Sequence, residues 1–295
     1  MPDVQIFDRW LLRRRQARAR AQGLATFLLD RAAAELGERL DAVLRHFAVA
    51  AEIGAATDAV RHALRASGKV ETIVAVSPSP PHGGLRIVAD EEALPFADAS
   101  LDLAVSALSL HAVNDLPGTL IQIRRALKPD GLLLAALLSG ETLNELRQAF
   151  ALAESELEGG LSPRVAPFAD LHEIGALLQR AGFALPVVDS DKLIVRYDSA
   201  FALMRDLRGM GATNALVERR RVPLKRSTLL RMAQIYAERF SDADGRVRAT
   251  FEIAWLTGWA PHESQQKPLQ PGSAARRLAD ALGTQERSAG EKTGR

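Results

Sequence analysis

The chain has 295 residues, of which 47% are apolar, and carries a formal net charge of +2 at pH 7. This length and apolar share allow one large buried core. The chain contains no cysteine, which excludes disulfide scaffolds, thiolate zinc sites and cysteine nucleophiles. No apolar run reaches the roughly 20 residues that span a bilayer, and the first residues do not read as a secretory signal. We therefore predict a soluble protein of the cytoplasm.

Arginines gather near the N-terminus, at Arg13, Arg14, Arg15, Arg18 and Arg20. On a helix, such a run is either a solvated face or a contact for an acidic partner. Because the overall charge is small, the run gives no reason to expect a nucleic-acid binder.

The first half of the chain alternates between predicted strands and helices. Asp8 to Arg45 has a helical pattern, which forms a preface over residues 1–45. We expect strands at Phe47–Ile53, Val70–Val76, Leu85–Ala89, Leu101–Leu110 and Leu132–Leu138, and helices at Thr57–Ala66 and Asp115–Leu127. Strands joined by helical crossovers predict a parallel sheet in an α/β fold.

The second half contains a predicted insertion. We expect helices at Glu141–Glu158, Asp170–Ala181, Ser199–Met210 and Ser227–Phe240, and strands at Pro186–Tyr197 and Ala249–Trp259. The helices within residues 199–240 interrupt the alternation, so we predict that they cover the binding edge of the sheet. Residues 46–262 then form one domain. The polar composition of residues 263–295 predicts a disordered tail with one weak helix around Ala274–Leu282.

In open α/β sheets the ligand binds beyond the carboxyl ends of the strands, so we expect a nucleoside site to be formed by the turns there. The first turn runs from Glu52 to Asp58 and keeps only Gly54 of a glycine-rich loop, with Ala56 in its middle. At the end of the second strand, Ala75 stands where a carboxylate usually binds the ribose hydroxyls. A hydrogen bond to a charged group contributes about 1.5–3 kcal/mol, so this loss weakens a nucleoside ligand.

The next two turns carry polar side chains. Asp90 follows the third strand, where its carboxylate either accepts from an adenine amino group or caps a solvated loop. His111 and Asn114 follow the fourth strand, and each is either catalytic or structural. No set of His, Asp and Glu has the spacing of a metal triad, so we expect no metal.

The segment "ADEEALPFADASLDLAVSALSLHAVNDLPGTLIQIRRALKPDGLLLAALLSGETLNELRQAF" resembles the core of class I S-adenosylmethionine-dependent methyltransferases. Within that class the resemblance is closest to the methyltransferase-like assembly factors of respiratory complex I and their bacterial relatives. The segments "IFDRWLLRRRQARA", "LMRDLRGMGATNA" and "ATFEIAWLTGWAPHESQQKP" resemble them too, so the similarity covers residue 5 to about residue 268.

The resemblance implies a doubly wound, seven-stranded, mostly parallel sheet, with the last strand inserted antiparallel. It also implies S-adenosylmethionine as cofactor. The positions that it assigns to the cofactor are Glu52, Gly54, Ala56, Ala75, Asp90, Glu91 and Ala107, with His111 beside the last of them. Ala56 and Asp58 depart from the glycines of the family loop, Asp58 adding a negative charge, and Ala75 departs from its acid. We therefore expect the cofactor to bind weakly or not at all.

For function, the resemblance implies a protein substrate, a subunit of the complex I peripheral arm, which is either methylated or hydroxylated at an arginine. Two alternatives stay open. A degenerate cofactor loop fits a scaffold without catalysis. The "LKPDG" turn and the helical insertion are shared with malonyl-acyl-carrier-protein methyltransferases, in which we would expect an intact glycine loop. Arg205, Arg208 and the run Arg219 to Arg221 in the insertion are candidate contacts for an acidic partner.

Overall fold

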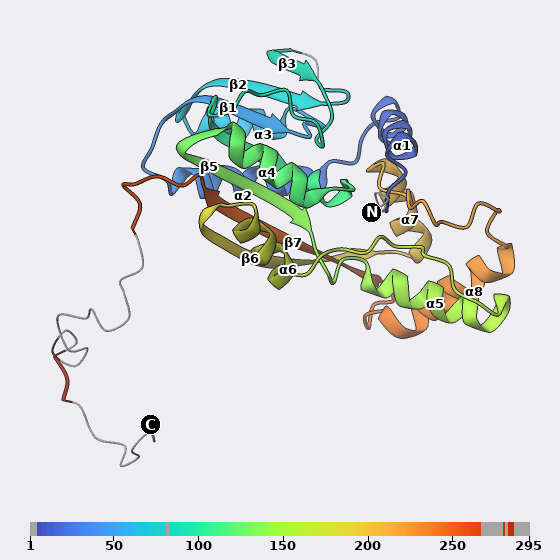
Figure 1. The fold of residues 1–295 in the computed structure, drawn as a ribbon. Helices are drawn as coiled ribbons and strands as arrows, with labels where there is room; N and C mark the ends of the chain where they lie inside the picture. The colour runs from blue at the N-terminus through green and yellow to red at the C-terminus, as the bar shows by residue number, and fades with distance from the viewer. Residues whose placement is uncertain (1–4, 81–82, 267–279, 281–282, 286–295) are drawn as a thin grey trace. The chain divides into compact units, whose positions relative to one another are not determined.

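Seven strands form one sheet, in the order β3-β2-β1-β4-β5-β7-β6, in a computed structural model that describes residues 5–80, 83–266, 280 and 283–285 (Figure 1). The strands are β1 (Phe47–Ile53), β2 (Val70–Ser77), β3 (Leu85–Val88), β4 (Leu101–Ala107), β5 (Leu127–Leu138), β6 (Ala184–Tyr197) and β7 (Val247–Trp259). Strands β1 to β5 pair in parallel, and β7 runs antiparallel between β5 and β6. The predicted sheet is confirmed.

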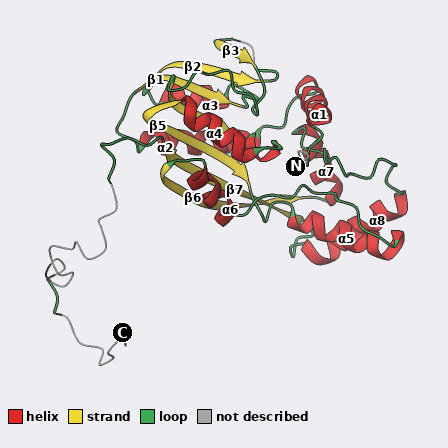
Figure 2. Ribbon diagram, in the orientation of Figure 1, coloured by secondary structure: helices red, strands yellow, loops and turns green. Residues whose placement is uncertain are grey.

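Helices lie between the strands in the chain (Figure 2). They are α1 (Arg9–Ala21), α2 (Phe27–Asp41), α3 (Ala59–Ala66), α4 (Leu116–Ala126), α5 (Asn144–Glu158), α6 (Leu171–Arg180), α7 (Ala200–Gly209) and α8 (Arg226–Phe240). The helical preface is thus two helices. The first of them, α1, ends at Ala21, and Gly23 follows with φ +90°. This left-handed conformation is common at the end of a helix, where glycine adopts it readily because it has no Cβ.

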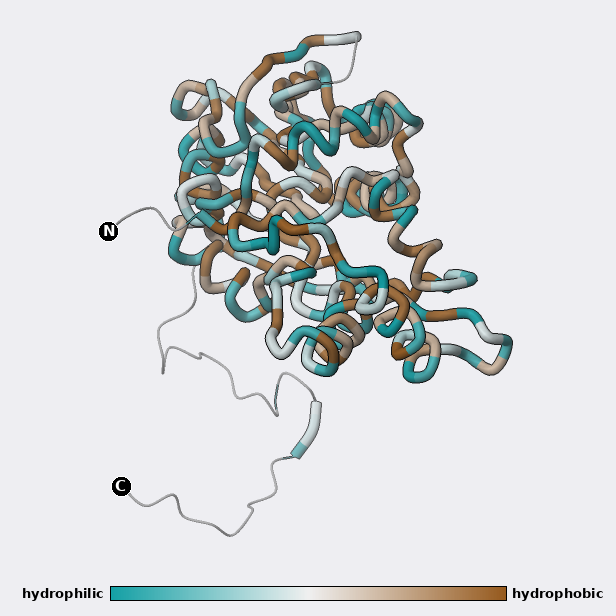
Figure 3. The backbone as a smooth tube through the Cα atoms, turned by 90° about the vertical axis from the view of Figure 1, so that its right-hand side faces the viewer, coloured by the Kyte–Doolittle hydropathy of each residue, from teal (hydrophilic) through white to brown (hydrophobic). Residues whose placement is uncertain are grey.

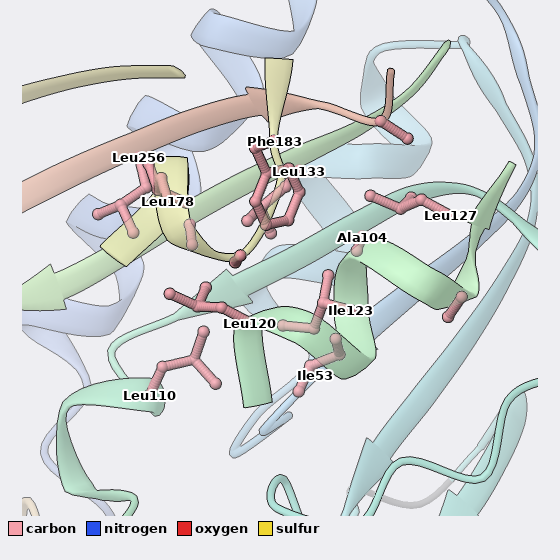
Figure 4. Packing of buried hydrophobic residues seen from close by; sticks show 14 of the residues in the cluster. Ile53, Ala104, Leu110, Leu120, Ile123, Leu127, Leu133, Leu178, Phe183 and Leu256 are labelled. Carbon is pink, nitrogen blue, oxygen red and sulfur yellow. The ribbon is translucent and has the colours of Figure 1, made fainter. Parts of the chain in front are cut away.

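The two faces of the sheet have separate apolar cores, because successive strand residues point to opposite sides. On one face, Ile123 of α4 and Leu178 of α6 pack with Leu133 of β5 (Figure 4). On the other face, Leu36 of α2 and Leu64 of α3 belong to the second core. Both faces are therefore covered by helices, as a parallel sheet requires.

A third core belongs to a lobe built by α5, α7 and α8 on the half of β7 that begins at Val247. Leu203 of α7, Tyr236 of α8 and Phe251 of β7 are buried there. Along the helical coils of the tube in Figure 3, apolar and polar stretches alternate, as they do in amphipathic helices. Of the insertion predicted for residues 199–240, α8 packs on α5, and α7 packs on α1 and α8.

Strand β4 is shorter than predicted. It ends at Ala107, because Leu108 has φ +50° and leads into a short 3-10 helix, η1 (Leu110–Ala112). This early end brings the following loop over the edge of the sheet.

The chain divides into two units, Met1–Pro261 and His262–Arg295. The first holds the whole sheet. In the second, His262 Nδ1 lies 2.7 Å from Ser264 Oγ. Most of the predicted tail, with the helix around residues 274–282, lies outside the described residues. None of the described helices is long and apolar enough to cross a bilayer.

Candidate cofactor and acceptor cavities

The turns after β1, β2 and β4 line a cavity of about 440 Å³, which we name the strand-end cavity. Its wall includes residues 54–56, 77–79 and 107–109, and α1 supplies Trp10, Arg13, Arg14 and Arg20 from the opposite side. The cavity lies at the edge of the sheet where the sequence predicts a ligand, and its volume is typical of small-molecule sites.

The structure brings some of the predicted site residues to this cavity and leaves others elsewhere. On its wall lie Gly54, Ala56, Glu91, Ala107 and His111. Away from it lie Glu52, Ala75, Asp90 and Asn114.

Strand β2 runs one residue further than predicted, which bears on the position predicted for the ribose. Ala75 lies within the strand, fully buried and paired in register with Glu52 of β1. Ser77 is the last residue of β2 and lies on the cavity wall. Ser77 is therefore a second candidate for the ribose position, which the strand end predicted at Val76 left out.

Glu52 lies behind the cavity, only 2% exposed, and its Oε2 has no hydrogen-bond partner. The pKa of Glu52 is raised to about 7. Burial is the main cause, the negative charge of Asp58 adds to it, and the positive charge of Arg61 acts in the opposite direction. Asp58 Oδ1 lies 2.6 Å from Arg61 Nη1, and Asp58 does not line the cavity. The expectation that Asp58 would set a negative charge against the ligand is therefore wrong.

Gly54 forms the floor of the strand-end cavity in a left-handed conformation with φ +77°. Its N–H donates to the Val76 carbonyl at 2.7 Å. A Cβ atom built on it would lie 1.8 Å from Ser109 Oγ. The single glycine that remains in the turn is thus required by the close approach of Ser109, whatever the cavity binds.

Helix α1 is fastened over the strand-end cavity by four charged residues, which we name the clasp: Arg9, Arg13, Asp90 and Glu91. Arg9 Nη2 lies 2.5 Å from both Asp90 Oδ1 and Glu91 Oε2, and Arg13 pairs with Asp90. Burial opposes ionisation of Asp90, but the Glu92 N–H and the two guanidinium groups hold its pKa below the ordinary value. The carboxylates predicted for adenine are therefore already neutralised by α1.

His111 and Asn114 have different environments. Nδ1 of His111 is enclosed without a partner and the ring packs edge-on against Phe168, with centroids 5.9 Å apart. Burial lowers the pKa of His111 to about 4, so it is neutral at pH 7. Asn114 Oδ1 accepts from the N–H groups of Ile6 and Phe7 at 2.9 and 2.7 Å, which anchors the segment before α1.

A second cavity of about 480 Å³ opens toward the lobe, and we name it the lobe cavity. Its wall comes from the first residues of the chain, from α5, from residues 164–168 and from α7 with the loop that follows it. Seven residues lie on both cavities: Leu12, Leu28, His111, Ala112, Leu138, Met210 and Ala212. The two cavities are therefore neighbours that share a wall at His111.

The insertion contributes to the lobe cavity unequally. Met204 and Leu207 of α7 line it, whereas none of its described lining residues comes from α8. Two of the arginines predicted for a partner are already paired. Arg219 lies 3.1 Å from Asp8 Oδ2, and Arg220 lies 3.2 Å from Glu158 Oε2.

Over the part of the chain that the structure describes, no three His, Asp or Glu side chains come together as metal ligands.

Comparison with known proteins gives the chain its family. A family model described as a methyltransferase domain matches residues 51–135. The protein named arginine-hydroxylase NDUFAF5, mitochondrial, from Rattus norvegicus is 39% identical over 94% of this chain and 84% of its own length. The Homo sapiens protein of that name is 39% identical over 92% of this chain and 81% of its own. This chain belongs to the NDUFAF5 family.

The NDUFAF5 family has further relatives. A malonyl-[acyl-carrier protein] O-methyltransferase of Xylella fastidiosa is 41% identical over 59% of this chain and 57% of its own length. Among solved structures, a putative methyltransferase of Bacillus halodurans has a TM-score of 0.53 at 15% identity, covering 78% of this chain and 99% of that chain. The structural likeness confirms the methyltransferase fold.

Proposed function

We propose that this chain binds S-adenosylmethionine in the strand-end cavity and acts on a protein side chain that enters the lobe cavity. The observation that carries the proposal is the shared wall of the two cavities at His111 and Ala112. A cofactor in one cavity and an acceptor in the other would approach each other at these shared residues, where the reacting atoms have to be close. The full-length similarity to the arginine-hydroxylase relatives supports a protein as the acceptor.

The residues present fit the cofactor in position and in cavity size. The turn at Gly54 to Ala56, together with Ser77, Glu91 and Ala107, would hold the nucleoside and the sulfur-bearing chain. When bound, the cofactor supplies an activated methyl group. Burial lowers the pKa of His111 to about 4, which makes it a weak base, so we assign it the role of shaping the wall between the cavities.

We propose weak cofactor binding. Ser77 offers the ribose a hydroxyl in place of a carboxylate, and Glu91 is already bound to Arg9 at 2.5 Å. Each lost hydrogen bond to a charged group costs about 1.5–3 kcal/mol, which is at least tenfold in affinity. A ligand that enters beneath α1 also requires either that the ion pairs of the clasp break or that it passes beside them.

The protein substrate that we propose is a peripheral-arm subunit of respiratory complex I, and its modification is either a methyl group or a hydroxyl group on arginine. The names of the arginine-hydroxylase relatives favour the hydroxyl group. Those names place the relatives in mitochondria, and for this chain the cytoplasm remains a prediction. Mass spectrometry of the subunit after incubation with the purified protein separates the two modifications.

Two other functions have specific support. The clasp, which neutralises Asp90 and Glu91, favours a scaffold that no longer needs the cofactor. The relatives named malonyl-[acyl-carrier protein] O-methyltransferase favour an acyl carrier as the acceptor, although their similarity covers about three fifths of this chain.

Calorimetric titration of the full-length protein with S-adenosylmethionine tests the proposal. We expect saturable binding in the range from tens of micromolar to millimolar. The matched variant is Ala56→Leu, which fills the strand-end cavity without touching the clasp and should abolish the heat of binding. Absence of binding to the unaltered protein, with its fold intact by circular dichroism, would favour the scaffold.

A further inference from the structure

The wall of the strand-end cavity carries several charged side chains, and they differ in their partners. Apart from His111, whose low pKa keeps it neutral at pH 7, the ionisable side chains among the described lining residues are Arg13, Arg14, Arg20 and Glu91. Arg13 and Glu91 belong to the clasp, where each is bound to a group of opposite charge. Outside the clasp, the wall therefore has two arginines, both from α1.

These two arginines have different surroundings. Arg14 is exposed, and its guanidinium carbon lies 4.5 Å from the centroid of the Trp10 ring. Arg20 is half-buried. Burial lowers the pKa of Arg20, and no neighbouring charge in the described part of the chain contributes to the shift. A partly enclosed cation without a counterion attracts an anion, so Arg20 is the uncompensated charge of this cavity.

Helix α1 places Arg20 at a defined distance from the clasp. Arg13 and Arg20 are seven residues apart, which is close to two turns, so they lie on the same face of the helix and about 10.5 Å apart along its axis. Gln16 and Ala17, between them, also line the cavity. At the clasp end, Arg13 is paired with Asp90. The helix therefore runs along the cavity with engaged arginines at one end and Arg20 at the other.

The half of α1 that carries Arg20 is held in place by the loop after α7. A Cβ atom built on Gly211 would lie 2.8 Å from the Cα of Gln16, so the two backbones are in close contact. Just beyond the helix, the N–H of Ala25 donates to the carbonyl of Gly209 at 3.0 Å. The backbone at Arg20 is thus fixed before a ligand binds, which lowers the entropic cost of using its side chain.

We propose that Arg20 binds the carboxylate at the amino-acid end of the cofactor and makes the strand-end cavity selective for a nucleoside that carries an amino acid. The inference rests on the proposed function and deepens it by naming a specificity-determining residue. The arginines of the clasp are engaged by Asp90 and Glu91, so the carboxylate of S-adenosylmethionine is attracted to Arg20 and the nucleoside extends toward the clasp. A guanidinium can donate two parallel hydrogen bonds to one carboxylate.

Two ligands that differ by one carboxylate test the proposal. S-adenosylhomocysteine carries the carboxylate. The compound 5′-S-(3-aminopropyl)-5′-thioadenosine has the same nucleoside, sulfur and amino group but lacks it. By calorimetry on the full-length protein at pH 7, we expect S-adenosylhomocysteine to bind at least tenfold more tightly than the aminopropyl compound.

Variants of α1 identify the residue that reads the carboxylate. Arg20→Gln should weaken S-adenosylhomocysteine about tenfold and leave the aminopropyl compound unchanged, so the ratio of the two affinities approaches one. A change that only disturbed the helix would weaken both ligands alike. Arg20→Lys keeps the charge and should keep part of the ratio. Arg14→Gln is the matched comparison, because it removes a positive charge from the same helix and the same wall. It should leave the ratio as in the unaltered protein.

Three results would each overturn the inference: equal affinities of the two ligands for the unaltered protein, an unchanged ratio in Arg20→Gln, or an equal fall of the ratio in Arg14→Gln. In all three the nucleoside still binds, so the proposed function stands. Absence of binding by both ligands, with the fold intact by circular dichroism, would contradict the proposed function and the inference together.

Discussion

The strand-end cavity and the lobe cavity are similar in size and share a wall, yet the charged side chains on their walls have different partners. In the strand-end cavity, the acid on the wall, Glu91, is bound by Arg9 of α1, which also binds Asp90. In the lobe cavity, Arg15 donates to the carbonyl groups of Thr213 and Asn214, and the negative charge of Asp8 acts on it as well. The carboxylate on the first wall is therefore paired with a guanidinium, whereas the guanidinium of Arg15 on the second wall contacts carbonyl groups.

The difference follows from which segment each arginine faces. Arg9 and Arg13 project from α1 toward the turn after β3, whereas Arg15 projects toward the loop after α7. One short helix therefore contributes arginines to both cavities, since Arg14 and Arg20 also lie on the wall of the strand-end cavity. The comparison predicts that changes on either side of the shared wall have separable effects.

The largest expected effect comes from opening the clasp. Arg9→Ala leaves Glu91 without its cation and Asp90 with Arg13 alone, and it removes the bond from Arg9 Nη1 to the Ala112 carbonyl. Breaking a largely buried ion pair typically costs about 3–5 kcal/mol. We expect a loss in the free energy of unfolding near the lower end of this range, measured with urea.

The matched control for Arg9→Ala is Arg18→Ala, since Arg18 is an exposed residue of the same helix. Its stability should change by less than about 0.5 kcal/mol. Equal stabilities for the two variants would show that the clasp does not fasten α1.

The next effect concerns the pH dependence of stability, which two titratable groups should set: Glu52 behind the strand-end cavity and His111 on the shared wall. Glu52 has a pKa raised from 4.5 to about 7, so its contribution to stability is complete below pH 4.5 and is lost as the pH rises through 7. His111 has a pKa lowered from 6.5 to about 4, so its contribution is complete above pH 6.5 and is lost as the pH falls through 4.

Between about pH 4.5 and 6.5 these contributions have opposite slopes and cancel, so the unaltered protein should show a nearly flat profile from this pair. Glu52→Gln should make stability rise with pH, and His111→Gln should make it fall, each by about 3 kcal/mol over the window. Urea unfolding at several pH values measures both slopes. Slopes of the same sign in the two variants would contradict the assignment.

A smaller effect is expected on the floor of the strand-end cavity. In Gly54→Ala the new Cβ overlaps Ser109 Oγ at 1.8 Å in a left-handed conformation, which should cost about 1–3 kcal/mol of stability. Ser109→Gly removes the overlapping atoms, so the double variant should recover part of the loss. Additive losses in a double-mutant cycle would show that the two side chains do not compete for this space.

The smallest effect tests whether Ser77 lies at the ribose position. Ser77→Asp places a carboxylate on the wall and should tighten S-adenosylhomocysteine about tenfold by calorimetry, at some cost in stability because Ser77 is only 4% exposed. Ala75→Asp is the control, because a carboxylate at this fully buried position should destabilise the sheet without improving binding. Tighter binding in Ala75→Asp would restore the position predicted from sequence.

The sequence by itself determined most of the fold. Apolar runs at residues 47–53 and 132–138 predicted buried parallel strands, because side chains packed from both faces leave no polar alternation. The family resemblance supplied the strand order, and the glycine turn at Gly54 located the edge where the cavities lie. These features are local patterns along the chain, which report burial and chain direction.

Only the tertiary structure decided which distant residues meet. The clasp joins Arg9 to Asp90, 81 positions apart, and the lobe cavity takes its wall from segments between Phe7 and Phe251. Sequence periodicity predicts that an arginine lies on a helix, but it does not predict whether its guanidinium will contact a carboxylate or a carbonyl group. The partner is set by how α1 docks across the ends of the strands, and that docking depends on apolar contacts and charges that are brought together only when the whole chain folds.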